Sequence, residues 1–192
     1  IIELVKNLKL PVRPHIVGHS MGGKIVMALL LKRPELVNKA VVVDIAPVSY
    51  SQRDGGSHNR IIDFMANFDL SRLHSREEVK EAIQQHFRTE RSQQLFLKNI
   101  KKTSSGFEWK INHQVISKHF DEISGCPSLP NSTYNKEILF IKGEQSNLIT
   151  GIECLQKEFP AARLIELPQC GHWIHSEQPE KLAQAIRNFL LG

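Results

Sequence analysis

Apolar residues occur along the 192-residue chain in two patterns. Short continuous runs rich in β-branched residues, such as residues 40–43, are typical of strands buried on both faces of a parallel sheet. Longer runs with apolar residues three or four positions apart are typical of helices. The predicted strands are residues 15–17, 40–43, 138–141 and 163–167, and the predicted helices are residues 1–7, 24–31, 152–159 and 179–192. This alternation predicts an α/β fold, a parallel sheet with helices on both faces.

Residues 49 to about 130 break the alternation, because they consist of consecutive polar and charged helical segments. Ser75 and Glu78 have the spacing of a capping box, which marks the start of one of these helices. The sequence therefore predicts a core made of residues 1–48 and 131–192, interrupted by a helical insertion. Because the insertion follows the second predicted strand, we expect it to lie over the carboxyl edge of the sheet, where open α/β folds bind ligands.

The turn after the first predicted strand reads Gly18-His19-Ser20-Met21-Gly22, which is the pattern G-x-S-x-G between a strand and a helix. A serine on such a sharp turn has a strained backbone, so we expect that Gly18 and Gly22 must lack side chains. The Ser20 hydroxyl would point into a cleft. The Met21 amide, at the helix N-terminus, could donate to an oxyanion that develops there. The pattern predicts that Ser20 is a nucleophile.

The same turn admits a second interpretation as a phosphate-binding loop. Gly18 to Lys24 also spells G-x-x-x-x-G-K, and residues 41–44 resemble the strand and aspartate of a nucleotide-hydrolase metal site. Such a loop needs Ser or Thr after the lysine to hold magnesium, and this chain has Ile25. Binding of ATP or GTP is therefore disfavoured.

A serine hydroxyl needs a base, and the usual base is a histidine oriented by a carboxylate. His172 follows the last predicted strand and fits the chain order serine, acid, histidine. Two carboxylates are candidates for the acid. Asp44 is favoured because it ends the strand beside the nucleophile strand, at the same edge as Ser20. Glu144, in the loop after residues 138–141, is the alternative.

The other histidines and the cysteines indicate no second site. His19 fills a variable position of the turn, and His175 is interpreted as a core or supporting residue. Cys170, His172 and His175 could be metal ligands, but two of them would come from one short loop without a fourth partner. We expect no metal and no cofactor.

Composition restricts the partners and the compartment. The formal charge of +5 comes from basic residues interleaved with acidic ones, and the densest basic group, Lys98, Lys101 and Lys102, is interpreted as a solvated helix face. We therefore expect no nucleic-acid partner. No apolar run approaches the roughly 20 residues of a membrane-spanning helix. Three cysteines without C-x-x-C spacing favour a reducing, intracellular compartment.

Four segments carry a family resemblance, namely residues 17–24, 33–37, 43–48 and 171–175. Together they are similar to the α/β-hydrolase fold, specifically to the YbfF-like esterases and their eukaryotic abhydrolase-domain relatives. The resemblance implies that Asp44 rather than Glu144 is the acid, that residues 49–130 form a helical cap, and, because some relatives are mitochondrial, a mitochondrial matrix or cytoplasmic location. The family's N-terminal strands and second oxyanion donor have no counterpart, so we expect the chain to correspond to the C-terminal two-thirds of such a hydrolase.

The predicted function is a serine hydrolase that cleaves small carboxylic esters or thioesters without a cofactor. Ser20 attacks the acyl carbon, His172 moves the proton, Asp44 orients the imidazole and the Met21 amide holds the oxyanion. The alternative is a binding or scaffold protein that keeps the fold without turnover.

Overall fold

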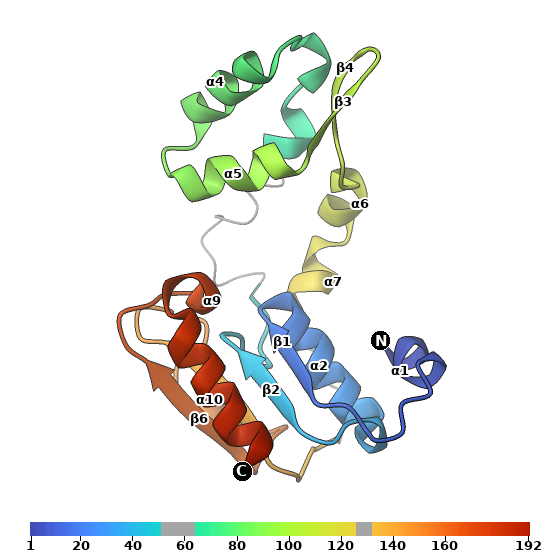
Figure 1. Cartoon of the computed structure of the whole chain (residues 1–192), viewed down its shortest axis with the longest axis vertical. Coiled ribbons are helices and arrows are strands. Elements are labelled where there is room, and N and C mark those ends of the chain that lie inside the picture. Colours follow the sequence, from blue (N-terminus) through green and yellow to red (C-terminus); the bar gives the residue numbers. More distant parts are fainter. Residues whose placement is uncertain (51–63, 126–131) are drawn as a thin grey trace. The chain divides into compact units, whose positions relative to one another are not determined.

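The computed structural model describes residues 1–50, 64–125 and 132–192. The chain forms two compact units, a core unit made of Ile1–Tyr50 and Ser124–Gly192 and an inserted unit made of Ser51–Ile123 (Figure 1). The predicted boundary near residue 130 and Cys126, one of the three cysteines, lie outside the described residues.

The core unit is built on a four-stranded parallel sheet of order β1-β2-β5-β6. The strands are β1 (Ile16–His19), β2 (Ala40–Val43), β5 (Ile138–Gly143) and β6 (Ala162–Leu167). Every residue of β2 is buried, as its unbroken β-branched run predicts for a strand inside a parallel sheet. The predicted α/β class is confirmed. Since all strands run the same way, their carboxyl ends, and the loops that follow, share one edge.

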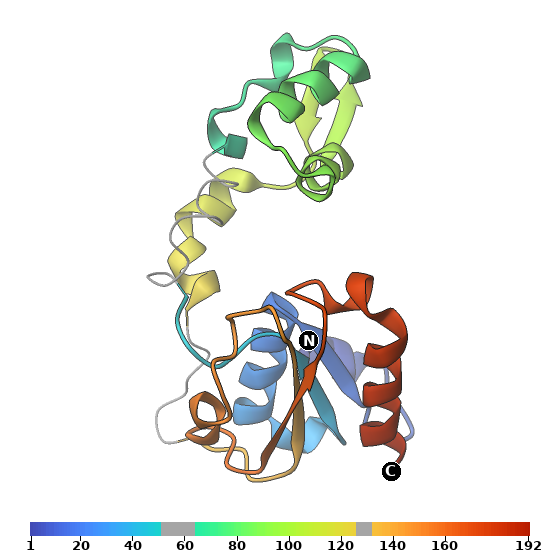
Figure 2. The same ribbon diagram turned by 90° about the vertical axis from the view of Figure 1, so that its left-hand side faces the viewer.

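Helices cover both faces of this sheet (Figure 2). Alternate residues of β2 enter two separate apolar clusters, Val42 with Met27 of α2 and Val41 with Phe189 of α10. The core helices are α1 (Ile2–Asn7), α2 (Met21–Lys32), α8 (Glu153–Gln156), α9 (Ile174–Glu177) and α10 (Pro179–Leu191). Helix α8 is shorter than predicted and ends at Gln156. None of the described helices has the length and apolar character that crossing a membrane requires.

The inserted unit contains a β-hairpin that the sequence pattern did not predict. Its described elements are η2 (Leu70–Arg72), α4 (Arg76–His86), α5 (Glu90–Lys98), β3 (Ile100–Thr103), β4 (Gly106–Trp109), α6 (His113–Lys118) and α7 (Phe120–Ser124). Lys101 and Lys102 therefore lie on β3, and their interpretation as a helix face is wrong. The hairpin is explained by Gly106, whose φ of 131° suits glycine, and by an alternation that buries Phe107 and exposes the Lys101–Glu108 ion pair.

Aromatic rings form the core of the inserted unit. Phe96 is fully buried, and Phe64 and Phe87 pack against it with ring centroids 5.1 and 4.3 Å away. The predicted N-cap of α4 is present, because the Ser75 hydroxyl accepts a hydrogen bond from the Glu78 amide at 3.1 Å. The unit thus has its own core and its own helix cap.

Lys24 links the two places where the chain leaves and re-enters the core unit. Its side chain is buried, and its ammonium donates to the backbone carbonyls of Val48, Ser124 and Gly125. The Tyr50 ring lies beneath it, 4.8 Å from Nζ. Because the ammonium is engaged with these carbonyls, Lys24 is not presented to a phosphate as the lysine of a nucleotide-binding loop would be.

We predict that Lys24→Met lowers the free energy of unfolding by about 2–3 kcal/mol, since three buried carbonyls lose a charged donor. Lys32→Met, at the exposed end of the same helix, is the matched control and should change stability by less than about 0.5 kcal/mol. Urea unfolding of both variants measures the difference. Equal midpoints would show that Lys24 does not hold the two segments together.

Candidate active site

Ser20 lies at the sharp turn between β1 and α2, at the carboxyl edge of the sheet. Its backbone has φ 55° and ψ −123°, a conformation that a residue with a side chain rarely adopts. The turn is held by hydrogen bonds from the Ser20 amide to Val43 of the neighbouring strand and from the Gly23 amide back to Ser20. The strained backbone directs the side chain away from both flanking elements.

Glycines allow this turn to pack, but not at both positions that the pattern indicates. A Cβ on Gly18 would overlap the backbone of Gly22, so Gly18 must lack a side chain. A Cβ on Gly22 would meet no atom within 4 Å, so the expected steric requirement at Gly22 is wrong. The requirement falls on Gly23, where a Cβ would lie 2.5 Å from Ile45 Cγ2. The third glycine of the turn was the available signal in the sequence.

We predict that Gly18→Ala and Gly23→Ala each lower the free energy of unfolding by about 2–3 kcal/mol, because both force atoms into occupied space. Gly22→Ala should leave it unchanged or raise it by up to about 1 kcal/mol, since alanine favours helix over glycine. Denaturant unfolding of the three variants measures how much each one changes the free energy of unfolding. An equally large loss from Gly22→Ala would contradict the packing described for the turn.

Three side chains form a continuous hydrogen-bonded relay. His172 Nε2 lies 3.0 Å from Ser20 Oγ, and His172 Nδ1 lies 2.8 Å from Asp44 Oδ2. Asp44 is fully buried, whereas the His172 side chain is 24% exposed. A carboxylate only accepts, so Nδ1 carries the proton and Nε2 is free to accept from the serine hydroxyl. The structure thus brings together the predicted nucleophile, base and favoured acid.

The Asp44 carboxylate is surrounded by donors from two segments of the chain, the end of β5 with the loop that follows it and the loop after β6. Besides His172, it accepts from the Gly143 amide at 3.1 Å and from the Ser146 hydroxyl at 2.5 Å. Its own amide donates to Ile141, which anchors the end of β2 to β5. These hydrogen bonds replace the water contacts that the carboxylate loses by burial. The sequence analysis did not identify Ser146 as a partner of Asp44.

Glu144, the alternative acid, makes a different contact. Its carboxylate accepts from the backbone amide of Gln169 at 2.8 Å. The Glu144 amide donates to Leu167 and the Gln145 amide donates to Cys170, so this loop runs along the segment that leads to His172. Glu144 therefore supports the position of the base loop, while Asp44 contacts the imidazole.

The amide of Met21 lies at the N-terminus of α2, directly after Ser20. Its role as an oxyanion donor stays a prediction. Met21 is the first residue of α2, so its N–H has no carbonyl within the helix to donate to. The 12-residue helix adds the partial positive charge of its N-terminus at this point.

The thiols and histidines nearby do not form a second reactive centre. Cys170 is buried and its thiol donates to the Leu167 carbonyl, and burial raises the pKa of that thiol. Among the described residues, no three His, Cys, Asp or Glu side chains meet in a way that could hold a metal ion. The absence of a metal and of a cofactor stays a prediction.

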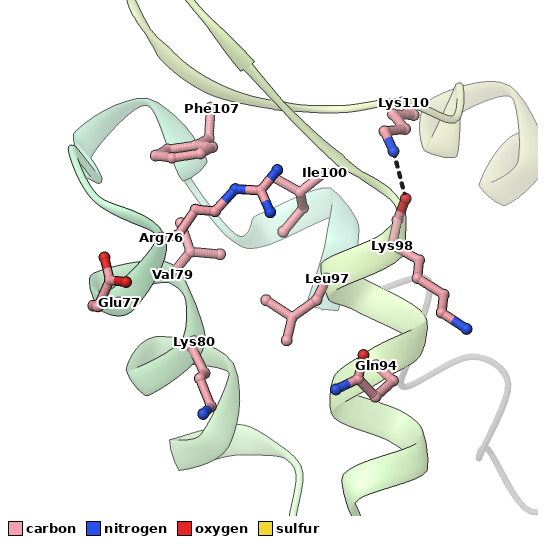
Figure 3. Close-up of a pocket in the computed structure, with 10 residues that line it drawn as sticks. All are labelled: Arg76, Glu77, Val79, Lys80, Gln94, Leu97, Lys98, Ile100, Phe107 and Lys110. Carbon is pink, nitrogen blue, oxygen red and sulfur yellow. Dashed lines mark hydrogen bonds between the residues drawn. The ribbon is translucent and has the colours of Figure 1, made fainter.

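The inserted unit has a cavity of about 550 Å³ between α4, α5 and the hairpin (Figure 3). Its floor is apolar, with Val79, Ile100 and Phe107, and Arg76 and Lys80 are among the basic side chains around it. None of the lining residues is a serine, cysteine or histidine. The cavity therefore lacks the groups of the relay.

The fold and the relay define an α/β hydrolase, and comparison with known proteins agrees. Residues 1–179 match the family described as the alpha/beta hydrolase fold, and the chain belongs to that family. The resemblance to this family and to YbfF-like esterases is thereby confirmed.

Individual relatives are named as esterases and lipases. The chain is 32% identical over 176 residues to the esterase YbfF of Escherichia coli (strain K12), covering 91% of the chain and 66% of that protein. It is 31% identical over 181 residues to the sn-1-specific diacylglycerol lipase ABHD11 of Danio rerio, covering 91% of the chain and 56% of that protein. The solved structure of a marine microorganism esterase superposes with a TM-score of 0.90 at 31% identity, covering 98% of the chain and 74% of that protein. The chain spans between about half and two thirds of the length of these curated relatives.

Proposed function

We propose that the protein is a serine hydrolase that cleaves carboxylic esters or thioesters through an acyl-enzyme. The observation that carries the proposal is the unbroken relay from Ser20 through His172 to the buried Asp44. In this proposal Ser20 is the nucleophile, His172 the base and Asp44 the acid that orients the base.

The relay supplies each proton movement that ester cleavage needs. Ser20 Oγ forms a bond to the acyl carbon, its proton passes to His172 Nε2, and the carbonyl electron pair moves onto oxygen. Asp44 stabilises the resulting imidazolium through the Nδ1 hydrogen bond. Collapse of the intermediate breaks the bond to the alcohol or thiol, which takes the proton from His172. Water then repeats the sequence on the acyl-enzyme and releases the acid.

The helix that begins at Met21 stabilises the charge that appears on the carbonyl oxygen. Its first amide lies next to Ser20 in sequence, and an aligned donor of this kind contributes about 100- to 1000-fold in rate. Since the donor is a backbone N–H, the side chain at this position is free to vary without loss of the hydrogen bond.

The names of the relatives favour small acyl esters as the substrate class. The esterase from Escherichia coli and the diacylglycerol lipase from Danio rerio both act on ester bonds by name. We propose a small-molecule acyl ester for this protein. The competing function is a binding or scaffold protein in which the relay persists without turnover, and labelling of Ser20 separates the two.

We predict that a fluorophosphonate attaches to Ser20 and to no other serine, because only a serine paired with a base attacks phosphorus rapidly. Mass spectrometry should place the adduct on the peptide that contains Gly18 to Lys24. Ser20→Ala should abolish labelling, whereas Ser176→Ala should leave it unchanged. A folded sample that forms no adduct would support the binding or scaffold function, and an adduct elsewhere would reject the relay.

We predict that Asp44→Asn lowers turnover of a p-nitrophenyl ester by roughly 10³- to 10⁴-fold, because asparagine disturbs the tautomer and cannot stabilise imidazolium. Glu144→Gln should have a much smaller effect, since Glu144 contacts a backbone amide and not the imidazole. Circular dichroism checks that both variants are folded. If Glu144→Gln were the more damaging change, the acid assignment would be reversed.

A further inference from the structure

His19 connects the nucleophile turn to the backbone of the base. It is the last residue of β1, directly before Ser20, and its ring Nε2 donates to the backbone carbonyl of His172 at 2.8 Å. A carbonyl can only accept, so the proton lies on Nε2 of His19. The two imidazole rings are 4.7 Å apart and tilted by 34°.

This contact restrains a part of His172 that the relay does not. The relay fixes the imidazole through Asp44 and Ser20, whereas His19 fixes the main chain from which the imidazole extends. Backbone hydrogen bonds of the same loop run from Gln145 to Cys170 and from Gly171 to the Glu177 carboxylate. Neither Gln145 nor Glu177 belongs to β1 or α2. Through His19, the strand that presents the nucleophile also holds the base.

The surroundings of His19 disfavour a positive charge on its ring. Burial is the main cause that lowers the pKa of His19, and the hydrogen bond to the His172 carbonyl opposes it. The imidazoles of His172 and His175 also lower this pKa, and Asp44 raises it. His175 packs edge-on with ring centroids 4.9 Å apart, and Trp173 lies 6.0 Å away. A neutral neighbour avoids two like charges 4.7 Å apart during turnover.

We infer that His19 is a positioning residue that sets the distance between the nucleophile and the base by clamping the backbone of His172 to the end of β1. The inference rests on the proposed hydrolysis, in which Ser20 and His172 must stay within hydrogen-bond distance. A misplacement of about 1 Å in such a pair costs on the order of 100-fold in rate. The clamp therefore acts on turnover and not on the affinity for substrate.

The test compares two substitutions at one position. His19→Leu removes the donor, and we expect kcat for a p-nitrophenyl ester to fall by about 10- to 100-fold with little change in KM. His19→Gln carries an amide N–H the same number of bonds from Cβ as Nε2, and we expect it to restore most of kcat. His175→Leu is the matched control, because His175 touches the same ring but has no hydrogen bond to His172 among the described residues, and its kcat should stay close to that of the unmodified protein.

Three outcomes would overturn the inference. An unchanged kcat in His19→Leu would show that the clamp is not needed. Equal losses in His19→Leu and His19→Gln would show that the donor is not what matters. A loss in His175→Leu as large as that in His19→Leu would assign the effect to ring packing.

A measurement without turnover separates this inference from the proposed function. In protein with ¹⁵N-labelled histidine, the nitrogen shifts of His19 should report the Nε2–H tautomer, and those of His172 the Nδ1–H tautomer, whether or not esters are cleaved. His19→Leu should perturb the His172 signals and His19→Gln should restore them. Perturbation and rescue in a protein that does not label with fluorophosphonate would reject the hydrolase and keep the clamp. An undisturbed His172 in His19→Leu would reject the clamp alone.

Discussion

The buried carboxylate of Asp44 is the constraint on which the arrangement of the site depends. A charge without solvent is stable inside a protein only when hydrogen bonds replace its water shell. Asp44 obtains them from Gly143 at the end of β5, from Ser146 in the loop after β5 and from His172 in the loop after β6. Removing any one of these donors would leave the buried Asp44 carboxylate with one hydrogen bond fewer and no water to replace it. The need to satisfy one carboxylate therefore holds two loops of the core unit in a single relative position.

The same edge of the sheet also carries the backbone strain of the unit. Ser20 and Asp44 both have positive φ, 55° and 52°, and each directly follows a strand of the parallel pair β1 and β2. The rigid sheet below them supplies the packing that maintains such conformations. Gly143, at the end of β5, packs so closely against the carbonyls of Cys170 and Gly171 that a Cβ would not fit there. The strained backbone, the buried carboxylate and the tight glycine contacts thus lie at the same edge of the sheet. Strained residues persist only where many surrounding contacts fix their conformation.

The sequence predicts the parts of this arrangement that are local. Continuous β-branched runs identify the strands, and the G-x-S-x-G turn identifies Ser20 with no knowledge of distant residues. The relay partners follow from topology, because parallel strands place Ser20 and Asp44 at one edge. Hydrogen bonds between residues far apart in the sequence cannot be predicted from local patterns. Ser146 and His19 each bind a residue more than 100 positions away. The hairpin that contains Lys101 was missed because its strands are short and its buried residues are few.

A second buried charge shows how the core unit accommodates its insertion. Lys24 lies in the helix that begins beside Ser20, and it binds the chain where the insertion departs and returns. All three of the acceptors described for it are backbone carbonyls, at Val48, Ser124 and Gly125. A backbone acceptor is available whatever side chain stands at its position. These three hydrogen bonds do not depend on the side chains of the joining segments, although the Tyr50 ring also contacts the ammonium, whereas the Asp44 cluster requires a hydroxyl and an imidazole at fixed positions. The three backbone acceptors can thus bind Lys24 unchanged when the side chains at Val48 and Ser124 change.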